Sequence, residues 1–293
     1  MDALVLPAPA KLNLFLHVTG RRADGYHTLQ TLFQFLDHGD VVTLARRGDG
    51  RIVRRGGPPG VAPEADLAVR AARLLQARTG TAAGADITVD KRLPAGGGLG
   101  GGSSDAATVL VGLDRLWGTG LGEEALAALG LELGADVPVF VRGRAAWAEG
   151  VGEVLAPVAE LDEPWYVVLV PPVAVSTAEV FAHPQLPRQC PPIKIRDFLA
   201  GRATNVLESI VRSRYPEVDA ALRELGRLGP ARMTGSGACV FAPFAGEAAA
   251  RAAWAVLAPE WDGFVARGRN RSPLHEALDR GRADDFSWDV AKR

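Results

Sequence analysis

A run of glycines between residues 94 and 104 constrains this chain more than any other feature. Six of the seven residues from Gly96 to Gly102 are glycine, and Ser103, Ser104 and an apolar-periodic helix follow directly. Glycine loses more backbone freedom on ordering than any other residue, so such a run is typical of a backbone that approaches a ligand closely. At a helix N-terminus, free N–H groups and the helix dipole favour an anion, most often phosphate. The run therefore predicts a loop that cradles nucleotide phosphates.

Three of these glycines also satisfy the G-x-G-x-x-G spacing of dinucleotide-binding loops, namely Gly96, Gly98 and Gly101. Glu123 or Glu124 would then supply the acidic residue that such folds place further along the chain. The signal is weak, because the loop lies in mid-domain after elements that mostly do not alternate between strand and helix. Two serines and an aspartate also follow where a Rossmann helix normally packs. A Rossmann oxidoreductase therefore stays a less favoured alternative.

The run does not match a Walker loop. Gly97 and Gly102 have the required spacing, but Ser103 stands where the lysine must be. A flexible linker is a poor interpretation, because a strand precedes the run and an amphipathic helix follows it. A phosphate loop without its own lysine needs positive charge from elsewhere in the fold.

The bulk properties of the 293-residue chain narrow its class. With 47% hydrophobic and 23% charged residues its composition is ordinary for a globular protein, and its net charge of −1 argues against wholesale nucleic-acid binding. Cys190 and Cys239 match no metal or redox spacing, so we expect buried free thiols in a reducing compartment. No apolar run has membrane length, and the start lacks the basic region of a signal peptide. We expect a cytoplasmic protein that binds neither nucleic acid nor membrane.

Local patterns predict separate strands and helices in two domains. Strands are expected at Lys11–Val18, Asp40–Leu44, Ile52–Val53, Asp86–Val89 and Trp165–Val170. Helices are expected over Asp66–Arg78, from a Ser103 or Ser104 cap to Trp117, and over Glu123–Leu133, Asn205–Ser213 and Pro216–Leu228. Glycine turns are expected at Arg22–Tyr26 and Thr234–Gly237. Composition places a boundary at Pro157–Pro164, which gives domains of residues 1–160 and 161–280 and a polar tail of residues 281–293.

Two polar residues in apolar surroundings are candidates for chemistry. Lys11 begins a strand whose even-numbered apolar residues, 12 to 18, alternate onto one face, while Lys11 and Asn13 lie on the other. An isolated lysine at such a place is most often a solvated strand end. Asp136, in the segment Gly134–Pro138, is either a general base or simply a turn residue. Taken alone, neither residue decides between its two interpretations.

Three segments together resemble the GHMP family of small-molecule kinases. They are Pro9–Leu14, Pro94–Ala107 and Met233–Cys239. Two further segments, Arg22–Thr31 and Leu133–Phe140, are similar to the branch of this family whose substrate carries a cytidine diphosphate group. The resemblance implies a two-domain α+β kinase fold, with a ribosomal-protein-like N-terminal domain and a ferredoxin-like C-terminal domain. It places the ATP site between the domains.

The resemblance also implies the parts of a phosphoryl-transfer site. Backbone amides of the glycine loop would hold the ATP triphosphate, along Pro94, Ala95, Gly96, Gly97, Gly98, Leu99, Gly100, Gly101, Gly102, Ser103 and Ser104. Asp136 would take the proton of the acceptor hydroxyl. Lys11 would keep that carboxylate ionised and neutralise charge on the transferring phosphoryl group. Mg²⁺ would arrive with the ATP, and no metal ligand from the protein is expected.

A second group of residues would read the substrate. Cytosine presents a flat face and a polar edge, for which Tyr26 and His27 supply an aromatic ring and a donor–acceptor pair. Phe181 would close on the other face of the base, Thr177 would contact the polar part of the substrate, and Asn13 would orient it. Core packing is the alternative role of Tyr26 and Phe181, and a loop hydrogen bond that of His27. The expected partner is a small molecule with a cytidine diphosphate group, bound by a monomer or homodimer.

Three positions depart from the family pattern. Ala182 stands where lysine is common, Asp66 where asparagine is common and Val206 where aspartate is usual. The first removes one possible substrate contact, and the second puts a contact on the adenine side in doubt. None of the three changes the glycine loop or its two catalytic candidates.

Two other functions stay open at this point. One is a GHMP kinase that acts on mevalonate, homoserine or a sugar instead of on an isoprenoid precursor with a cytidine group. The Tyr26–His27 pair argues for the nucleobase-bearing substrate. The other is a nucleotide-binding regulator without catalysis, against which the retention of both Lys11 and Asp136 argues.

Overall fold

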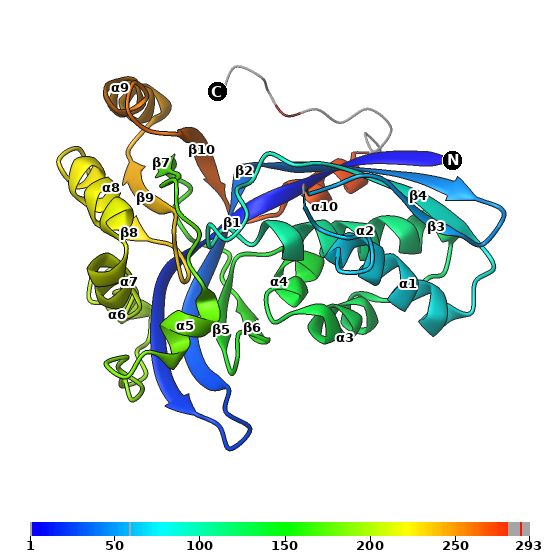
Figure 1. Cartoon of the computed structure of the whole chain (residues 1–293), viewed down its shortest axis with the longest axis horizontal. Coiled ribbons are helices and arrows are strands. Elements are labelled where there is room, and N and C mark those ends of the chain that lie inside the picture. The colour runs from blue at the N-terminus through cyan, green and yellow to red at the C-terminus, as the bar shows by residue number, and fades with distance from the viewer. Residues whose placement is uncertain (1, 59, 281–287, 289–293) are drawn as a thin grey trace.

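A continuous sheet of ten strands runs through the computed structural model, which describes residues 2–58, 60–280 and 288 (Figure 1). Seven strands follow one another in the order β3-β4-β2-β10-β7-β9-β8, while β1 pairs with β2 and β5 pairs with β2 and β6. The pair β3–β4 is parallel, and the pairs made by β1 with β2 and by β2 with β4 are antiparallel. The strands are β1 (Ala3–Arg21), β2 (His27–Arg47), β3 (Ile52–Gly56), β4 (Gly84–Asp90), β5 (Ala146–Glu149), β6 (Val154–Pro157), β7 (Trp165–Leu169), β8 (Arg232–Met233), β9 (Val240–Phe244) and β10 (Gly263–Arg269).

The long hairpin of β1 and β2 is the element that places the site. Figure 1 shows it, in blue, extending beyond the rest of the sheet to the turn that joins the two strands. That turn is the predicted Arg22–Tyr26, and the Arg22 N–H donates to the Tyr26 carbonyl across it (2.7 Å). Both strands extend beyond the predicted segments. Residues 6–18 of β1 are all buried, so alternation of apolar and polar residues marks only part of the strand.

Register shifts in β1 change the faces that alternation predicts. The pairing of β1 with β2 slips at two places before residue 16 and at a third after it. As a result Leu12 and Leu14 pack in one hydrophobic cluster, and Leu16 and Val18 pack in another. The prediction of a single apolar face for these four residues is therefore wrong, because bulges re-aim the side chains that follow them.

Five helices pack with the β1–β4 part of the sheet in the first hydrophobic core. The packing is close, since a Cβ added at Gly112 would lie 2.6 Å from a side-chain carbon of Leu44 and 2.8 Å from one of Leu6. The missing side chain of Gly112 therefore lets its helix lie directly on the strands. The helices are α1 (Leu67–Thr79), α2 (Gly101–Trp117), α3 (Glu123–Leu133), α4 (Val137–Arg142) and α10 (Pro273–Asp279).

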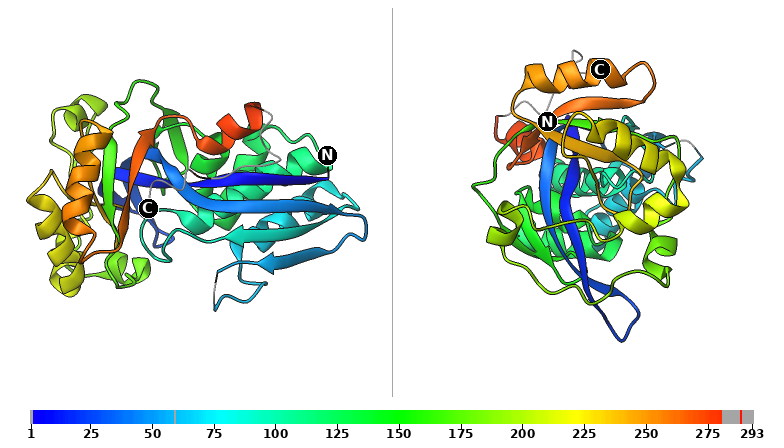
Figure 2. Two further views of the ribbon diagram at one scale, coloured as in Figure 1. Left: turned by 90° about the horizontal axis from the view of Figure 1, so that it is seen from above. Right: turned by 90° about the vertical axis from the view of Figure 1, so that its left-hand side faces the viewer.

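A second set of helices lies at the other end of the sheet, beside β7 to β10 (Figures 1 and 2). Apolar residues of α5, α7, α8 and α9 pack with β7, β9 and β10 in the second hydrophobic core. Phe198 of α6 instead borders the third cluster, which lies between the other two cores. The helices are α5 (Thr177–Ala182), α6 (Ile195–Leu199), α7 (Glu208–Arg214), α8 (Pro216–Gly226) and α9 (Glu247–Leu257).

Strands β2 and β10 join the two ends of the sheet, with Gly268 paired to Leu36. The third cluster spans the junction, because it contains Leu12 of β1 and Phe241 of β9. Helix α10 follows β10 in the chain yet packs through Leu274 with the first core. The α+β class is confirmed, while the division at residue 160 stays a prediction.

The structure confirms most predicted elements and corrects two helix starts, one of them that of α7, which begins at Glu208 and not at the predicted Asn205. Helices α1 and α3 match the predicted segments to within one residue at each end. Helix α2 begins at Gly101 with Gly100 at the N-cap, so the predicted capping by Ser103 or Ser104 is wrong. Of the predicted tail, residues 281–287 and 289–293 lie outside the described residues, and Trp288 is buried with its indole N–H donating to the Asp40 carbonyl (3.0 Å). Across the described residues, no helix combines the length and apolarity needed to cross a membrane.

Candidate active site

Lys11 is a buried cation in the middle of the long hairpin. Only 3% of it is exposed, and its backbone N–H donates to the Leu99 carbonyl of the glycine loop (3.0 Å). Three oxygens surround its ammonium group: Asn13 Oδ1 at 2.5 Å, the Gly98 carbonyl at 3.0 Å and Asp136 Oδ2 at 3.3 Å. These match the three N–H donors of an ammonium, as a buried charge requires. The alternative of a solvated strand end is therefore wrong.

Asp136 reaches the same point from the connection between α3 and α4. It stands directly before α4, whose first turn contains Pro138 and whose residues 137–141 are buried. The packed helix fixes the backbone, while 35% of the Asp136 side chain is exposed and lines the pocket. A carboxylate that is paired with a buried ammonium and open to a pocket can accept a proton from a bound hydroxyl.

Hydrogen bonds to its carbonyl groups hold the glycine loop in place. The oxygens of residues 96 and 97 accept from the backbone N–H groups of residues 238 and 239 (3.2 and 3.1 Å). The Gly98 oxygen accepts from the Thr234 hydroxyl (3.2 Å) as well as from Lys11. The N–H groups of residues 98–102, by contrast, make no hydrogen bond within the described part of the chain. Since backbone donors are nearly always paired in folded proteins, these groups are available to an anionic ligand.

Alternate glycines give the loop its shape. Gly96, Gly98 and Gly100 have φ angles of +68°, +74° and +73°, a region of backbone conformation that residues other than glycine rarely adopt. At Gly98 the surroundings add a second constraint, because a Cβ there would lie 2.2 Å from the Thr234 carbonyl oxygen.

We expect Gly98→Ala to weaken ATP binding by at least about tenfold. Left-handed strain is worth about 1–2 kcal/mol for a residue with a side chain, and 1.4 kcal/mol corresponds to tenfold in affinity. The methyl group would also meet backbone, so the loop must move away from the second glycine turn. Titration calorimetry with ATP checks this, with Gly122→Ala as the control, because nothing lies within 4 Å of a Cβ at Gly122. Equal affinities in the two variants would contradict the role given to the loop.

Most of the loop residues predicted to hold ATP line one of two different cavities or are buried. Those that line the main pocket are Gly96, Gly98 and Gly100. Those that line a second cavity of about 250 Å³ are Pro94, Ala95 and Gly97. Leu99 and Ser104 are buried, and the Ser104 hydroxyl has no hydrogen-bond partner within the described residues. Contact with ATP stays a prediction for the whole loop, and Ser103 is the more accessible of its two serines.

The two cysteines are free, as predicted. Cys239 lies behind the glycine loop on the wall of the smaller cavity, and burial raises the pKa of its thiol to about 12. Cys190 is half-buried rather than buried, which corrects that part of the prediction. A thiol as unreactive as that of Cys239 serves packing.

The second glycine turn, Thr234–Gly237, connects the second hydrophobic core to the pocket. Asn205 holds it, because its amide Nδ2 donates to the carbonyls of Met233 (2.9 Å) and Gly235 (2.8 Å). Ser236 then reaches Thr177 at the start of α5, with 2.6 Å between the two hydroxyl oxygens. Ser236 lines the pocket, although the sequence motif alone predicts no role for it.

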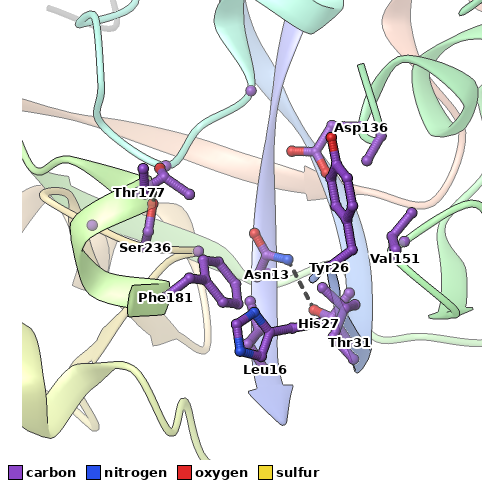
Figure 3. A pocket seen from close by; sticks show the side chains of 18 of the residues that line it. Asn13, Leu16, Tyr26, His27, Thr31, Asp136, Val151, Thr177, Phe181 and Ser236 are labelled. Carbon is purple, nitrogen blue, oxygen red and sulfur yellow. Dashed lines mark hydrogen bonds between the residues drawn. The ribbon is translucent and has the colours of Figure 1, made fainter. Parts of the chain in front are cut away.

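A single pocket of about 810 Å³ collects the predicted catalytic and substrate-binding residues (Figure 3). They come from the hairpin, the glycine loop, the α3–α4 connection and α5. The predicted residues that line it are Lys11, Asn13, Tyr26, His27, Gly96, Gly98, Gly100, Asp136, Thr177 and Phe181. The structure therefore brings together side chains that are up to 170 positions apart in the chain, from Lys11 to Phe181.

Aromatic side chains form the outer part of this pocket. Tyr26 and Phe181 lie on opposite sides of it, with open space between them in front of Asn13 (Figure 3). Tyr26 is 67% exposed, so the alternative of core packing is wrong for this residue. The Phe181 ring packs beside His27, with 5.3 Å between ring centroids and 31° between ring planes. A flat ring bound between Tyr26 and Phe181 would be stacked on both faces.

Asn13 occupies the inner part of the pocket, beside Lys11. Its Oδ1 accepts from Lys11, and its Nδ2 donates to the Thr31 hydroxyl (2.9 Å), the bond drawn in Figure 3. The Thr31 hydroxyl in turn donates to the Phe15 carbonyl. These bonds fix the orientation of the amide and leave one of its two N–H donors for a ligand.

A buried cluster of three charged side chains fixes the segment that leads into the glycine loop. Lys91 pairs with Asp105 in the first half of α2 (2.8 Å) and with Asp40 in β2. Asp40 also accepts from the backbone N–H groups of Arg92 (2.6 Å) and Leu93 (2.8 Å), the residues that lead into the loop. Burial raises the pKa of Asp105, the Asp40 carboxylate raises it further, and Lys91 opposes both. This cluster was not predictable from the sequence, because its members share no local spacing.

The three departures from the family pattern have separate structural consequences. Ala182 lines the pocket, so the wall at that point carries no charge. Asp66 is buried, caps α1 by accepting from the Ala68 N–H (3.0 Å) and pairs with Arg54 (3.0 Å). Val206 packs against the second core. The Asp66 carboxylate is thus committed to the fold.

The described residues contain no group of three or more His, Cys, Asp or Glu side chains that could hold a metal ion. Mg²⁺ in nucleotide sites is commonly held by one or two carboxylates together with substrate phosphates and water. Two carboxylates line the pocket, Asp24 in the hairpin turn and Asp136 beside Lys11, and they belong to no such group, which fits an ion that arrives on the nucleotide.

Comparison with known proteins matches this chain to one family along most of its length. Residues 66–144 match the family model of the GHMP kinases N terminal domain, and residues 194–261 match that of the GHMP kinases C terminal domain. The chain is 62% identical over 276 residues to the 4-diphosphocytidyl-2-C-methyl-D-erythritol kinase of Halorhodospira halophila, which covers 94% of this chain and 96% of that protein.

Solved structures of kinases share the fold of this chain. A crystal structure of 4-(cytidine 5'-diphospho)-2C-methyl-D-erythritol kinase is similar, with a TM-score of 0.80 and 36% identity over 90% of this chain and 99% of that one. A homoserine kinase from Cytophaga hutchinsonii has a TM-score of 0.69 at 17% identity, over 93% of this chain and 96% of that one. At that identity the likeness concerns the fold alone.

Proposed function

Because the chain belongs to the GHMP kinases and, within them, to the 4-diphosphocytidyl-2-C-methyl-D-erythritol kinases, we propose that Lys11 and Asp136 transfer the γ-phosphoryl group of ATP to the 2-hydroxyl of that cytidylyl substrate. The chain is an ATP-dependent kinase with an alcohol acceptor, and its product serves isoprenoid precursor synthesis by the route without mevalonate. One observation carries the proposal: a single pocket holds the paired carboxylate, the free loop amides and the aromatic wall.

Asp136 is the general base of the proposed reaction. It accepts the proton of the acceptor hydroxyl while that oxygen bonds to the γ-phosphorus. The bond between the γ-phosphorus and the β–γ bridging oxygen breaks, and ADP leaves with the bond's electron pair. The ion pair of Asp136 with the ammonium of Lys11, 3.3 Å away, supports this role.

Lys11 acts as a fixed charge as well as a partner of the base. Its three donors are already used by Asn13, the Gly98 carbonyl and Asp136, so its contribution to the phosphoryl group acts through space. A buried, pre-oriented cation needs no reorganisation when negative charge develops nearby. This is the positive charge that a phosphate loop without its own lysine requires.

The phosphates bind along the loop and at the start of α2. The free N–H groups of residues 98–102 supply donors, and the 17-residue helix adds the positive end of its dipole. When bound, Mg²⁺ supplies further charge neutralisation at the phosphate oxygens. The cluster of Lys91 with two aspartates holds the loop and the start of α2 in fixed positions relative to each other.

The substrate lies along the hairpin with its acceptor end inward. Tyr26 and Phe181 enclose the cytosine ring, and His27 addresses its polar edge. Asn13 lies beside Lys11, so its free N–H orients the part of the substrate that carries the reacting hydroxyl. Thr177, held by Ser236, contacts the polar region between the two ends. The position of each of these residues in the pocket supports its assignment.

A kinase assay with three acceptors tests the proposal. ADP release is measured with the cytidylyl substrate, with mevalonate and with homoserine, and ³¹P NMR of the product identifies the phosphorylated hydroxyl. We expect turnover with the cytidylyl substrate alone and phosphate on its 2-hydroxyl. Turnover only with an acceptor that lacks the cytidine group would overturn the substrate assignment. ATP binding without any transfer would favour a nucleotide-binding regulator.

A further inference from the structure

Arg188 connects the two parts of the aromatic wall. It lies in the irregular segment after α5 and lines the pocket. Its Nε donates to Nε2 of His27 (3.1 Å), and its Nη2 donates to the carbonyls of Phe181 (3.0 Å) and His183 (2.8 Å). Its Nη1 donates to the Leu186 carbonyl (3.2 Å). One guanidinium therefore holds a side chain of β2 and the backbone that carries Phe181.

The hydrogen bond at Nε2 determines where the proton of His27 lies. A guanidinium stays protonated and can only donate, so Nε2 must be the acceptor. Burial lowers the pKa of His27, and the positive charges of Arg188 and Arg21 lower it further, so the ring is neutral at pH 7. A neutral imidazole carries one proton. With Nε2 accepting, that proton is on Nδ1.

We infer that Arg188 is a positioning residue, which makes His27 Nδ1 a hydrogen-bond donor in the pocket and thereby selects cytosine over uracil. The inference rests on the proposed function, since it takes the outer pocket to hold the base. Figure 3 shows the His27 ring inside the pocket beside Phe181, and with Nε2 occupied Nδ1 is the ring nitrogen left for a ligand.

The two pyrimidines differ at the atom that such a donor meets. Ring nitrogen N3 is an acceptor in cytosine and carries a hydrogen in uracil. The N–H donor at His27 Nδ1 pairs with the N3 acceptor of cytosine. In uracil the same donor faces the N3–H group, so both buried donors are left without an acceptor. Sites that hydrogen-bond a substrate group discriminate strongly against an analogue that cannot form the bond. Without Arg188 the imidazole is free to adopt either tautomer.

NMR of the ligand-free protein tests the tautomer without any substrate. The chain has five histidines, so ¹⁵N-histidine spectra of the wild type and of His27→Gln assign the His27 signals. We expect Nδ1 to be protonated and Nε2 unprotonated near pH 7.5, and a mixture of tautomers in Arg188→Met. A protonated Nε2 in the wild type would overturn the inference.

Kinetics tests the consequence for specificity. Wild type and Arg188→Met are compared with the cytidine and uridine forms of the diphosphate substrate. Arg214→Met is the control. Like Arg188, Arg214 contacts helix α5, where it pairs with Glu179 (2.9 Å), but it does not line the pocket. For Arg188→Met we expect KM for the cytidine form to rise about tenfold, kcat to stay within twofold, and the cytidine preference to fall about tenfold. Arg214→Met should match the wild type.

The outcomes separate this inference from the proposed function. An equal loss on both substrates with an unchanged His27 tautomer would reduce Arg188 to a structural residue and overturn the inference. A wild type that turns over neither form would contradict the proposed function, while the NMR result would still decide the tautomer. Circular dichroism of each variant, including His27→Gln, shows whether it is folded.

Discussion

Replacing Asp136 with alanine is expected to lower kcat by about 10²–10⁴-fold, the usual contribution of a general base, while ATP still binds. The Asp136 carboxylate lies against Lys11 in the pocket and is the proposed proton acceptor, whereas the loop amides proposed to hold the nucleotide belong to other elements. Single-turnover phosphoryl transfer and calorimetric ATP affinity measure the two effects separately. The ATP dissociation constant should change by less than about threefold.

Two further variants make this result specific. Asp136→Asn keeps the shape of the side chain but removes its basicity, so it should be as inactive as the alanine variant. Glu132→Gln removes an exposed carboxylate four residues upstream, which pairs with Arg78 on the surface, and should leave kcat unchanged. Turnover by Asp136→Asn within a few-fold of the wild type would contradict the assignment of the base.

Lys11→Met should lower kcat by about 10²–10³-fold, a loss typical of removing one preorganised charge that stabilises a transition state. The substitution takes away the partner of Asp136 and the only side-chain cation that contacts the Gly98 carbonyl in the described structure. Methionine has a similar length and is apolar, so it suits a position that is 3% exposed and lies 5.4 Å from the Phe33 ring centroid. Steady-state kinetics with a thermal melt separates lost chemistry from lost folding.

Lys194→Met is the matched control, because Lys194 is exposed at the start of α6 and lies outside the pocket. It should retain wild-type kcat. If Lys11→Met folds and keeps kcat within threefold of the wild type, the fixed-charge role is wrong. A melting temperature far below that of the control would instead show that the buried cation serves mainly to hold Asn13 and the loop together.

Helices with a clear apolar period were predictable from sequence because their pattern is local. The segments of α1 and α3 show apolar residues at spacings of three and four, and the structure places these residues in the first core. The strands were harder. Strand β1 is buried on both faces and contains bulges, so alternation marks only its middle and misassigns its faces.

The wrong start predicted for α2 has a physical reason at the site itself. Serine is a preferred N-cap, and Ser103 and Ser104 stand close before an apolar period. The helix instead starts from Gly100 in a left-handed conformation, which no side chain caps. The first-turn N–H groups thus stay free, as a phosphate site needs. Under the proposed function, phosphate binding rather than helix stability selects glycine at this position, and for that reason the local rule fails here.

The roles proposed for Lys11 and Asp136 were predictable only through the resemblance of whole motifs. Neither Lys11 nor Asp136 is distinctive by itself, and their 3.3 Å approach depends on a contact over 125 positions of the chain. Arg188 and the Lys91 cluster were not predictable at all. Their partners come from separate elements, and no spacing along the chain records such contacts.

A crystal structure of the protein with a non-hydrolysable ATP analogue and the cytidylyl substrate tests the central claim most directly. It measures the distance between the Asp136 carboxylate and the acceptor hydroxyl. We expect about 2.6–3.2 Å, the reach of a general base, with the γ-phosphorus on the far side of the hydroxyl and cytosine between Tyr26 and Phe181. A 2-hydroxyl bound out of reach of Asp136, or beside a different carboxylate, would contradict it.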